Sequence, residues 1–83
     1  MIEVHVLYFA SVREALGAGE SVATAAPTLG ALRDELLARG GVYTQALGRH
    51  RPLRMALDQV MCEEGVALHP GAEVAFFPPV TGG

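Results

Sequence analysis

The stretch PTLGALRDELLARGG, residues 27–41, gives the clearest structural signal in the chain. Its leucines stand at positions 29, 32, 36 and 37, the spacing of one apolar stripe along a helix. Thr28 occupies the position of an N-cap, and Gly40 and Gly41 supply a left-handed terminator, so we expect a helix over residues 29–39. A helix with a single apolar stripe must pack on one face of a sheet.

Gly30 lies in the first turn of this helix, where glycine costs about 1 kcal/mol relative to alanine. We interpret it as permitting a close approach of the helix to the sheet.

The first and last apolar segments of the chain are predicted to form the centre of that sheet. In residues 2–9, IEVHVLYF, one face is wholly apolar and the other changes from polar to apolar along its length. Residues 73–77, EVAFF, follow a turn at Pro70 and Gly71 and form the final strand. These two strands are the most apolar, so we place them side by side. Because only the whole chain joins them, they can run parallel.

Shorter elements lie between these segments. Residues 10–17 indicate a helical turn that Ser11 caps, with Glu14 three residues on as in a capping box, and that Gly17 ends. Residues 20–26 alternate weakly and are predicted to pair with the first strand. Residues 42–52 are compatible with a short helix and a loop, or with irregular structure throughout.

The second half of the chain adds one longer strand and two short extended pieces. Residues 54–60 alternate, with Met55, Leu57 and Gln59 on one side. A short strand at 60–62, an acidic turn at 63–65 and an extended piece at 66–68 follow. This order predicts an α+β fold of the β-grasp, or ubiquitin-like, type: a mixed sheet packed on one main helix over residues 1–77, with an extended tail at 78–83.

Composition narrows the class of protein. The chain has 83 residues, 51% of them hydrophobic, and a net charge of −3 with arginine as its only strong base. This balance argues against nucleic-acid binding, which needs a basic surface. The start MIEVHV lacks the features of a signal peptide, and no apolar stretch is long enough for a membrane span. We therefore expect a cytoplasmic protein without a membrane partner. A domain this small has little room for a deep cleft, so we expect any reactive site to be shared with a partner.

The final residues 76–83, FFPPVTGG, combine stiff and permissive residues. Phe76 is predicted to complete the core and Phe77 to face outward. Pro78 and Pro79 cannot donate ladder hydrogen bonds, so the sheet must stop there. The six residues of the tail can span about 20 Å when extended. Gly82 and Gly83 lack a Cβ and can enter a slot too narrow for other residues.

Three segments, FFPPVTGG, FASVREALG and PTLGALRDEL, together resemble the small subunit of molybdopterin synthase. This family consists of ubiquitin-like sulfur carriers, and the resemblance covers nearly the whole chain. It implies that a ubiquitin-activating-enzyme-like adenylyltransferase uses ATP to adenylate the carboxylate of Gly83, beside Gly82. Sulfur then replaces AMP and gives a thiocarboxylate.

The resemblance further implies that the tail enters the large subunit of molybdopterin synthase. There its sulfur would pass to cyclic pyranopterin monophosphate, and two deliveries would build the molybdopterin dithiolene. The chain would be no enzyme on its own, would bind no cofactor or metal, and would form a heterotetramer with the large subunit. The implied partner-binding residues are Phe77, Pro78, Pro79, Val80, Thr81 and Arg13.

Other functions fit parts of the pattern. A sulfur carrier for thiamin synthesis or RNA thiolation would share the chemistry at Gly83, whereas a ubiquitin-like modifier would be conjugated to lysines. A plain interaction domain would use the tail without chemistry.

Several polar and reactive residues receive structural interpretations. Lone Cys62 is interpreted as a small core residue, and the glutamates at 63 and 64 as a solvated turn. The histidines show no metal-ligand spacing. A basic cluster is interpreted as a solvated loop, with docking of an acidic patch as the alternative; its members are Arg49, His50, Arg51 and Arg54.

Overall fold

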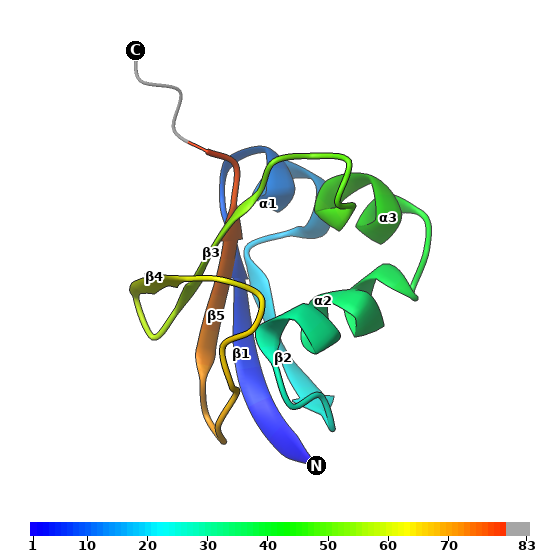
Figure 1. The fold of residues 1–83 in the computed structure, drawn as a ribbon. Helices are drawn as coiled ribbons and strands as arrows, with labels where there is room; N and C mark the ends of the chain where they lie inside the picture. Colours follow the sequence, from blue (N-terminus) through cyan, green and yellow to red (C-terminus); the bar gives the residue numbers. More distant parts are fainter. Residues whose placement is uncertain (80–83) are drawn as a thin grey trace.

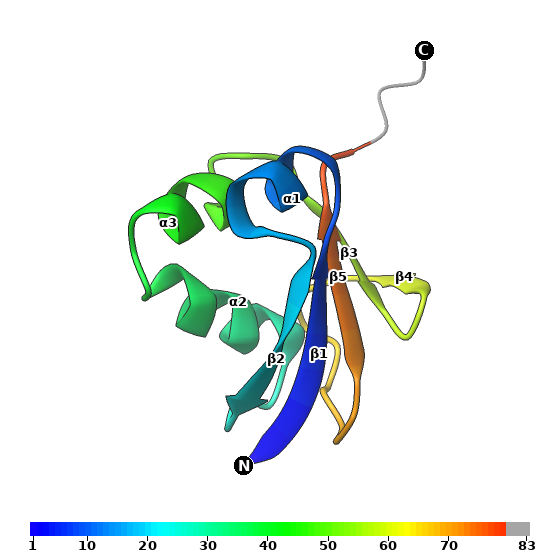
Figure 2. The same ribbon diagram turned by 180° about the vertical axis from the view of Figure 1, so that it is seen from behind.

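The computed structural model describes residues 1–79, which form a five-stranded sheet with helices on one of its faces (Figures 1 and 2). The strand order is β2-β1-β5-β3-β4. Within this part of the chain, no helix is long and apolar enough to cross a membrane. The elements, in chain order, are β1 Ile2–Tyr8, α1 Ala10–Leu16, β2 Gly19–Thr24, α2 Leu29–Leu37, α3 Val42–Leu47, β3 Arg54–Leu57, β4 Val60–Cys62 and β5 Glu73–Phe77.

The two central strands are the first and the last, as predicted. β1 and β5 run parallel, with Val6 beside Val74 and Tyr8 beside Phe76. β2 pairs antiparallel with β1, and β3 pairs antiparallel with both β5 and β4. The sheet is therefore mixed, and the predicted topology is confirmed.

The core lies between the sheet and the helices. The leucine stripe of α2 is confirmed at Leu29, Leu32 and Leu36, which are fully buried. The rings of Tyr8 and Phe76 stack beneath the helices with centroids 6.4 Å apart. Each such side chain stabilises the fold by about 1.5–3 kcal/mol through burial. The other fully buried apolar residues of the sheet are Val4, Val6 and Val74.

The ends of α2 are built largely as the sequence predicts. The hydroxyl of Thr28 accepts from the amide of Ala31 at 3.2 Å, so the N-cap is confirmed. The helix ends at Leu37, two residues before the predicted boundary, and Gly40 takes a left-handed φ of 73°. The close approach of Gly30 is to Glu64, rather than to the sheet. A Cβ at Gly30 would lie 2.9 Å from the Glu64 Cβ, and the Gly30 amide donates to the Glu64 carbonyl at 2.8 Å.

The predicted cap at Ser11 is wrong. α1 begins at Ala10, and Phe9 occupies the N-cap position without a side-chain cap. The Phe9 amide donates to the Phe76 carbonyl at 3.2 Å, so sheet bonding continues up to the helix start. Ser11 therefore lies inside the helix, where its hydroxyl accepts from Arg51 at 3.3 Å. Gly17 ends α1 with a φ of 91°, as predicted.

The strand predicted over residues 54–60 ends at Leu57, and the short strand predicted at 60–62 is confirmed as β4; a tight turn joins the two. Asp58 and Gln59 have φ of 50° and 69°, and β4 begins at the next residue. Two consecutive left-handed residues match the twist of a hairpin. Gln59 therefore belongs to the turn and not to the strand face. Residues 42–47 resolve to the helix α3.

The glutamates at 63 and 64 do not form a simple solvated turn, because Glu64 binds two arginines. Arg33 is only 3% exposed; it donates to Glu64 at 3.1 Å and to the carbonyls of Leu47 and Gly48 at 2.8 and 3.2 Å. Arg49 reaches the same Glu64 at 2.7 Å and Asp34 at 2.6 Å. Hydrogen bonds from Arg49 hold the pKa of Glu64 below its usual range. Arg49 thus remains exposed to solvent, as predicted, but it also links Asp34 to Glu64.

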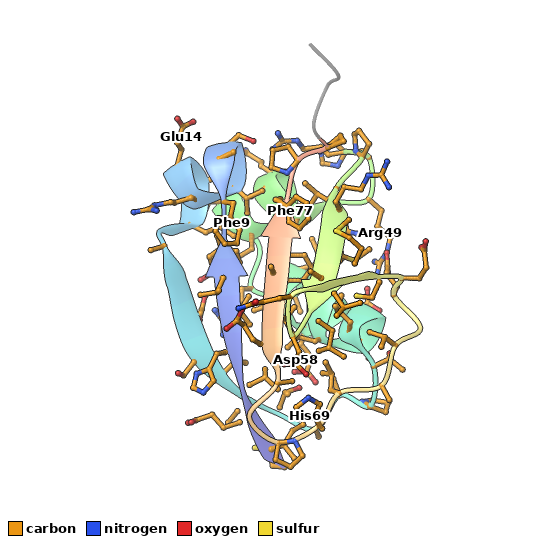
Figure 3. The ribbon with its side chains drawn as sticks, turned by 90° about the vertical axis from the view of Figure 1, so that its left-hand side faces the viewer. Phe9, Glu14, Arg49, Asp58, His69 and Phe77 are labelled. Atoms are coloured by element: carbon orange, nitrogen blue, oxygen red, sulfur yellow. The ribbon has the colours of Figure 1, made fainter. Side chains whose placement is uncertain are left out.

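At the end of the sheet where β5 begins, His69 joins the β3–β4 turn to the start of β5 (Figure 3). Its Nε2 lies 2.5 Å from the Asp58 carboxylate and its Nδ1 lies 2.9 Å from the Pro70 carbonyl. Both partners are acceptors, so the protonated ring donates to each. The second Asp58 oxygen accepts from the Glu73 amide at 3.0 Å.

Arg33→Met should destabilise the fold by about 3 kcal/mol, because it removes the buried partner of two carbonyls and of Glu64. Urea unfolding measures the difference. Arg13→Met, which removes an exposed arginine from α1, is the matched control and should change stability by about 0.5 kcal/mol or less. Equal effects of the two variants would contradict the structural role of Arg33.

The His69 contact should make stability depend on pH. The carboxylate of Asp58 raises the pKa of His69 above its ordinary 6.5, so this stabilisation is complete below pH 6.5 and is lost as pH rises through the raised pKa. The Glu73 amide and His69 lower the pKa of Asp58 below its ordinary 3.8. The stabilisation from the ionised Asp58 carboxylate is therefore lost only as the pH falls through that lowered pKa. The unfolding free energies of the wild type and His69→Ala should therefore converge above neutral pH. A difference that grows with pH would contradict this account.

Candidate functional site

The end of β5 separates core from surface within two residues. Phe76 is fully buried, whereas the side chain of Phe77 is partly exposed, as predicted. Pro78 and Pro79 follow outside the strand and are half-buried. They lie at the end of the sheet opposite the N-terminus (Figure 1). Val80, Thr81, Gly82 and Gly83 were also predicted as site residues and lie outside the described residues.

Phe77 has an aromatic partner that the sequence analysis did not identify as a site residue. Phe9 packs against it edge to face, with ring centroids 6.4 Å apart and an interplanar angle of 85°. Phe9 is 45% exposed. Figure 3 shows both rings together on the face of the sheet that the helices leave uncovered. The alternation of residues 2–9 already placed Phe9 on the second face of its strand, and this was the available signal.

Strand register extends this aromatic pair into a larger apolar surface. Leu7 lies beside Ala75, Ala75 beside Ala56, and Ala56 beside Met61. Cross-strand neighbours share a face, so this row crosses four strands next to the aromatic pair. Met61 is 56% exposed. We name this surface the open-face patch; Phe9 and Met61 are its exposed members, Leu7, Ala75 and Phe77 are half-buried, and Ala56 is only 7% exposed. Contiguous exposed apolar surfaces of this kind are typical of protein interaction sites.

Two exposed arginines lie near this end of the sheet, and one of them, Arg54, borders the open-face patch. Arg13 is exposed on α1, the helix that begins just after Phe9, so the structure brings this predicted residue to the same end as Phe77. Arg54 is exposed at the start of β3 and is the cross-strand neighbour of Phe77. Among residues 1–79, neither guanidinium has a hydrogen bond or an ion pair.

A pocket of about 420 Å³ opens beside the patch, between the β3–β4 hairpin and the root of the tail. Its lining includes Arg54, Met61, Cys62, Glu63 and Pro79. Burial raises the pKa of the Cys62 thiol, and the charge of Glu63 adds to this, so the thiol stays protonated at neutral pH. A half-buried, protonated Cys62 agrees with its interpretation as a small packing residue.

The described side chains are suited to binding rather than to bond making. The site combines an apolar surface, two prolines and two arginines. Within residues 1–79, no group of three His, Cys, Asp or Glu side chains could hold a metal ion. The arrangement therefore places an apolar surface and exposed arginines at the base of the C-terminal segment.

The sheet order, with α2 packed across one face, defines a ubiquitin-like β-grasp protein. A solved structure supports this class: Haloferax volcanii small archaeal modifier protein 1 superposes with a TM-score of 0.75 at 22% identity. The match covers 96% of this chain and 100% of that one.

Sequence comparison shows the family. The ThiS family profile matches residues 6–83, so the chain belongs to the ThiS family. The molybdopterin synthase sulfur carrier subunit of Escherichia coli is 42% identical over 81 residues, which covers 96% of this chain and 99% of that protein. The protein of the same name from Haemophilus influenzae is 36% identical over 85 residues, with the same coverage.

The contrast between Phe76 and Phe77 can be tested by paired substitutions. Phe76→Ala should lower the unfolding free energy by about 3–5 kcal/mol, since it leaves a cavity in the core. Phe77→Ala removes the edge-to-face contact with Phe9 at a half-buried position and should cost about 1 kcal/mol. Chemical denaturation of the two variants measures both values, and a larger loss for Phe77→Ala would contradict the assignment of faces.

Proposed function

We propose that this protein is the sulfur-carrying small subunit of a molybdopterin synthase, and that Gly83 carries the sulfur as a C-terminal thiocarboxylate. The observation that supports this most is the pair of relatives at 42% and 36% identity. Both bear the name molybdopterin synthase sulfur carrier subunit, and each is matched over 99% of its length. These names favour the molybdopterin branch over carriers for thiamin synthesis or RNA thiolation.

The geometry of the described residues suits this role. The parallel β1–β5 pair anchors the chain up to Phe77, and Pro78 and Pro79 prevent further strand pairing. A segment of six residues beyond Phe77 can reach about 20 Å into a partner. Gly82 and Gly83 would fit where no side chain could.

The reaction begins with activation of a poor electrophile. A free α-carboxylate has a pKa of about 3.5 and is unreactive toward nucleophiles at neutral pH. A separate adenylyltransferase would transfer AMP from ATP to the Gly83 carboxylate, with release of pyrophosphate. A sulfur nucleophile then attacks the acyl carbon and AMP leaves, giving the thiocarboxylate. Activation thus divides one difficult substitution into two easier steps.

Delivery takes place in the large subunit. The thiocarboxylate sulfur would form a C–S bond to a side-chain carbon of cyclic pyranopterin monophosphate while the C–O bond at that carbon breaks and the oxygen leaves. Water would then attack the acyl carbon, so that the C–S bond to Gly83 breaks, the sulfur stays on the pterin and the carboxylate is restored. Two such deliveries complete the dithiolene. The small subunit supplies the reactive group and its position, whereas the partners supply charge stabilisation. It is therefore not an enzyme by itself.

The open-face patch is the surface proposed to hold the partners, together with Pro78, Pro79 and Arg13. Val80 and Thr81 would contact the partner along the entry path of the tail. Since activation and delivery both need the tail, the adenylyltransferase and the large subunit would bind this end in turn. Two small subunits on a large-subunit dimer would give a heterotetramer.

Intact-protein mass spectrometry tests the proposed chemistry. After incubation with the cognate adenylyltransferase, ATP and a sulfur donor, the mass should rise by about 16 Da, the replacement of oxygen by sulfur at the acyl carbon. Fragmentation should locate the change at Gly83.

A variant with one alanine added after Gly83 is the matched control. It should keep the unfolding midpoint of the wild type and show no mass gain. Sulfur incorporation elsewhere in the chain, or equal incorporation in the extended variant, would refute the thiocarboxylate proposal.

A further inference from the structure

The six arginines of the chain divide into two groups by their partners. Arg33, Arg39 and Arg49 form ion pairs with carboxylates of this chain. Arg51 donates to the hydroxyl of Ser11. Arg13 and Arg54 are exposed and have no such partner within residues 1–79, although the chain carries nine acidic residues. Within the described part of the chain, two guanidinium groups are thus available, and that of Arg54 belongs to the cross-strand neighbour of Phe77 in the open-face patch.

Arg54 differs from Arg13 because it also lines the pocket of about 420 Å³. That volume is within the usual range of ligand pockets, about 300–1,000 Å³. Met61 and Pro79 give the pocket apolar walls, and Pro79 is the second residue of the tail and the last that the structure describes. A group bound here would therefore lie directly beside the point where the tail leaves the body.

The charges around the pocket are arranged asymmetrically. The Arg54 guanidinium belongs to β3, whereas Glu63 follows β4 and is exposed. A carboxylate that enters the pocket is attracted by Arg54 and repelled by Glu63, so it would bind on the Arg54 side. A guanidinium fork matches a carboxylate with two parallel hydrogen bonds, which adds geometric selectivity.

We propose that Arg54 is a recognition residue for the large subunit: its guanidinium pairs with a partner carboxylate while a neighbouring apolar side chain of the partner enters the pocket. This inference rests on the proposed function, because it assumes that the partner bound at this surface is the large subunit of molybdopterin synthase. The contact would fix the position of residues 1–77 on the large subunit, next to the point where the tail enters it. Because the chain has a net charge of −3, it repels an acidic partner surface overall. The Arg54 contact would add a local attraction to that interface.

Affinity measurements with the cognate large subunit test the proposal. Arg54→Met keeps most of the side-chain volume and should weaken binding about tenfold, and Arg54→Glu should weaken it about a hundredfold. Gln59→Glu, at the exposed tip of the same hairpin, changes the net charge as much as Arg54→Met does and should stay within about twofold of the wild type. Both positions are exposed, so the unfolding midpoints of the three variants should match that of the wild type.

A charge-exchange experiment identifies the partner group. Single Asp→Arg and Glu→Arg variants of the large subunit are screened for one that restores binding of Arg54→Glu. Recovery at one site on the docking face supports the proposal, whereas no recovery at any surface carboxylate overturns it.

The remaining outcomes are also decisive. If Arg54→Met binds as tightly as the wild type, the recognition role is wrong while the proposed function stands. If Arg54→Met binds more tightly, Arg54 holds the chain's own tail, and the proposal is again wrong. If the wild type itself does not bind the large subunit, both this inference and the proposed function fail.

Discussion

The parallel pairing of β1 with β5 is the constraint on which the rest of the structure depends. It joins the first and last strands in the middle of the sheet, where Val6 and Val74 are buried under the helices. Because parallel strands end at the same edge, Phe9 and Phe77 meet there. The same pairing brings the root of the C-terminal segment to the edge of an uncovered apolar face. The docking surface is therefore a direct consequence of the topology.

Sequence patterns predicted the features that depend on periodicity. The leucine spacing of α2, the alternation of β1 and the two faces of residues 76 and 77 are all local signals, and the structure confirms them. The hairpin turn at Asp58 and Gln59 was missed because it contains no glycine. Likewise, Ser11 resembles a cap in sequence, but continued sheet bonding at Phe9 moves the start of the helix.

The sequence could not predict which charged side chains form ion pairs with one another. Arg33 and Glu64 are 31 residues apart, and nothing local indicates which acid a given arginine will meet. The buried Arg33 also satisfies two carbonyls at the end of α3, so it connects three segments of the helical layer. For the candidate site, the outward face of Phe77 was predicted from strand alternation, and the tail from its prolines, its glycines and the family resemblance. Phe9, the apolar row and the placement of Arg54 required strand register.

These features separate structural residues from those that meet a partner. Charged pairs and the core hold the helical side, while the opposite face keeps aromatic rings and arginines exposed. The central claim is that this body holds out a slender tail for use inside another protein. A photo-crosslinking amino acid at position 80, mixed with the cognate large subunit and mapped by mass spectrometry, tests it most directly. The account predicts adducts with residues lining the active-site pocket of the large subunit. Adducts confined to this chain's own sheet, with and without that subunit, would contradict it.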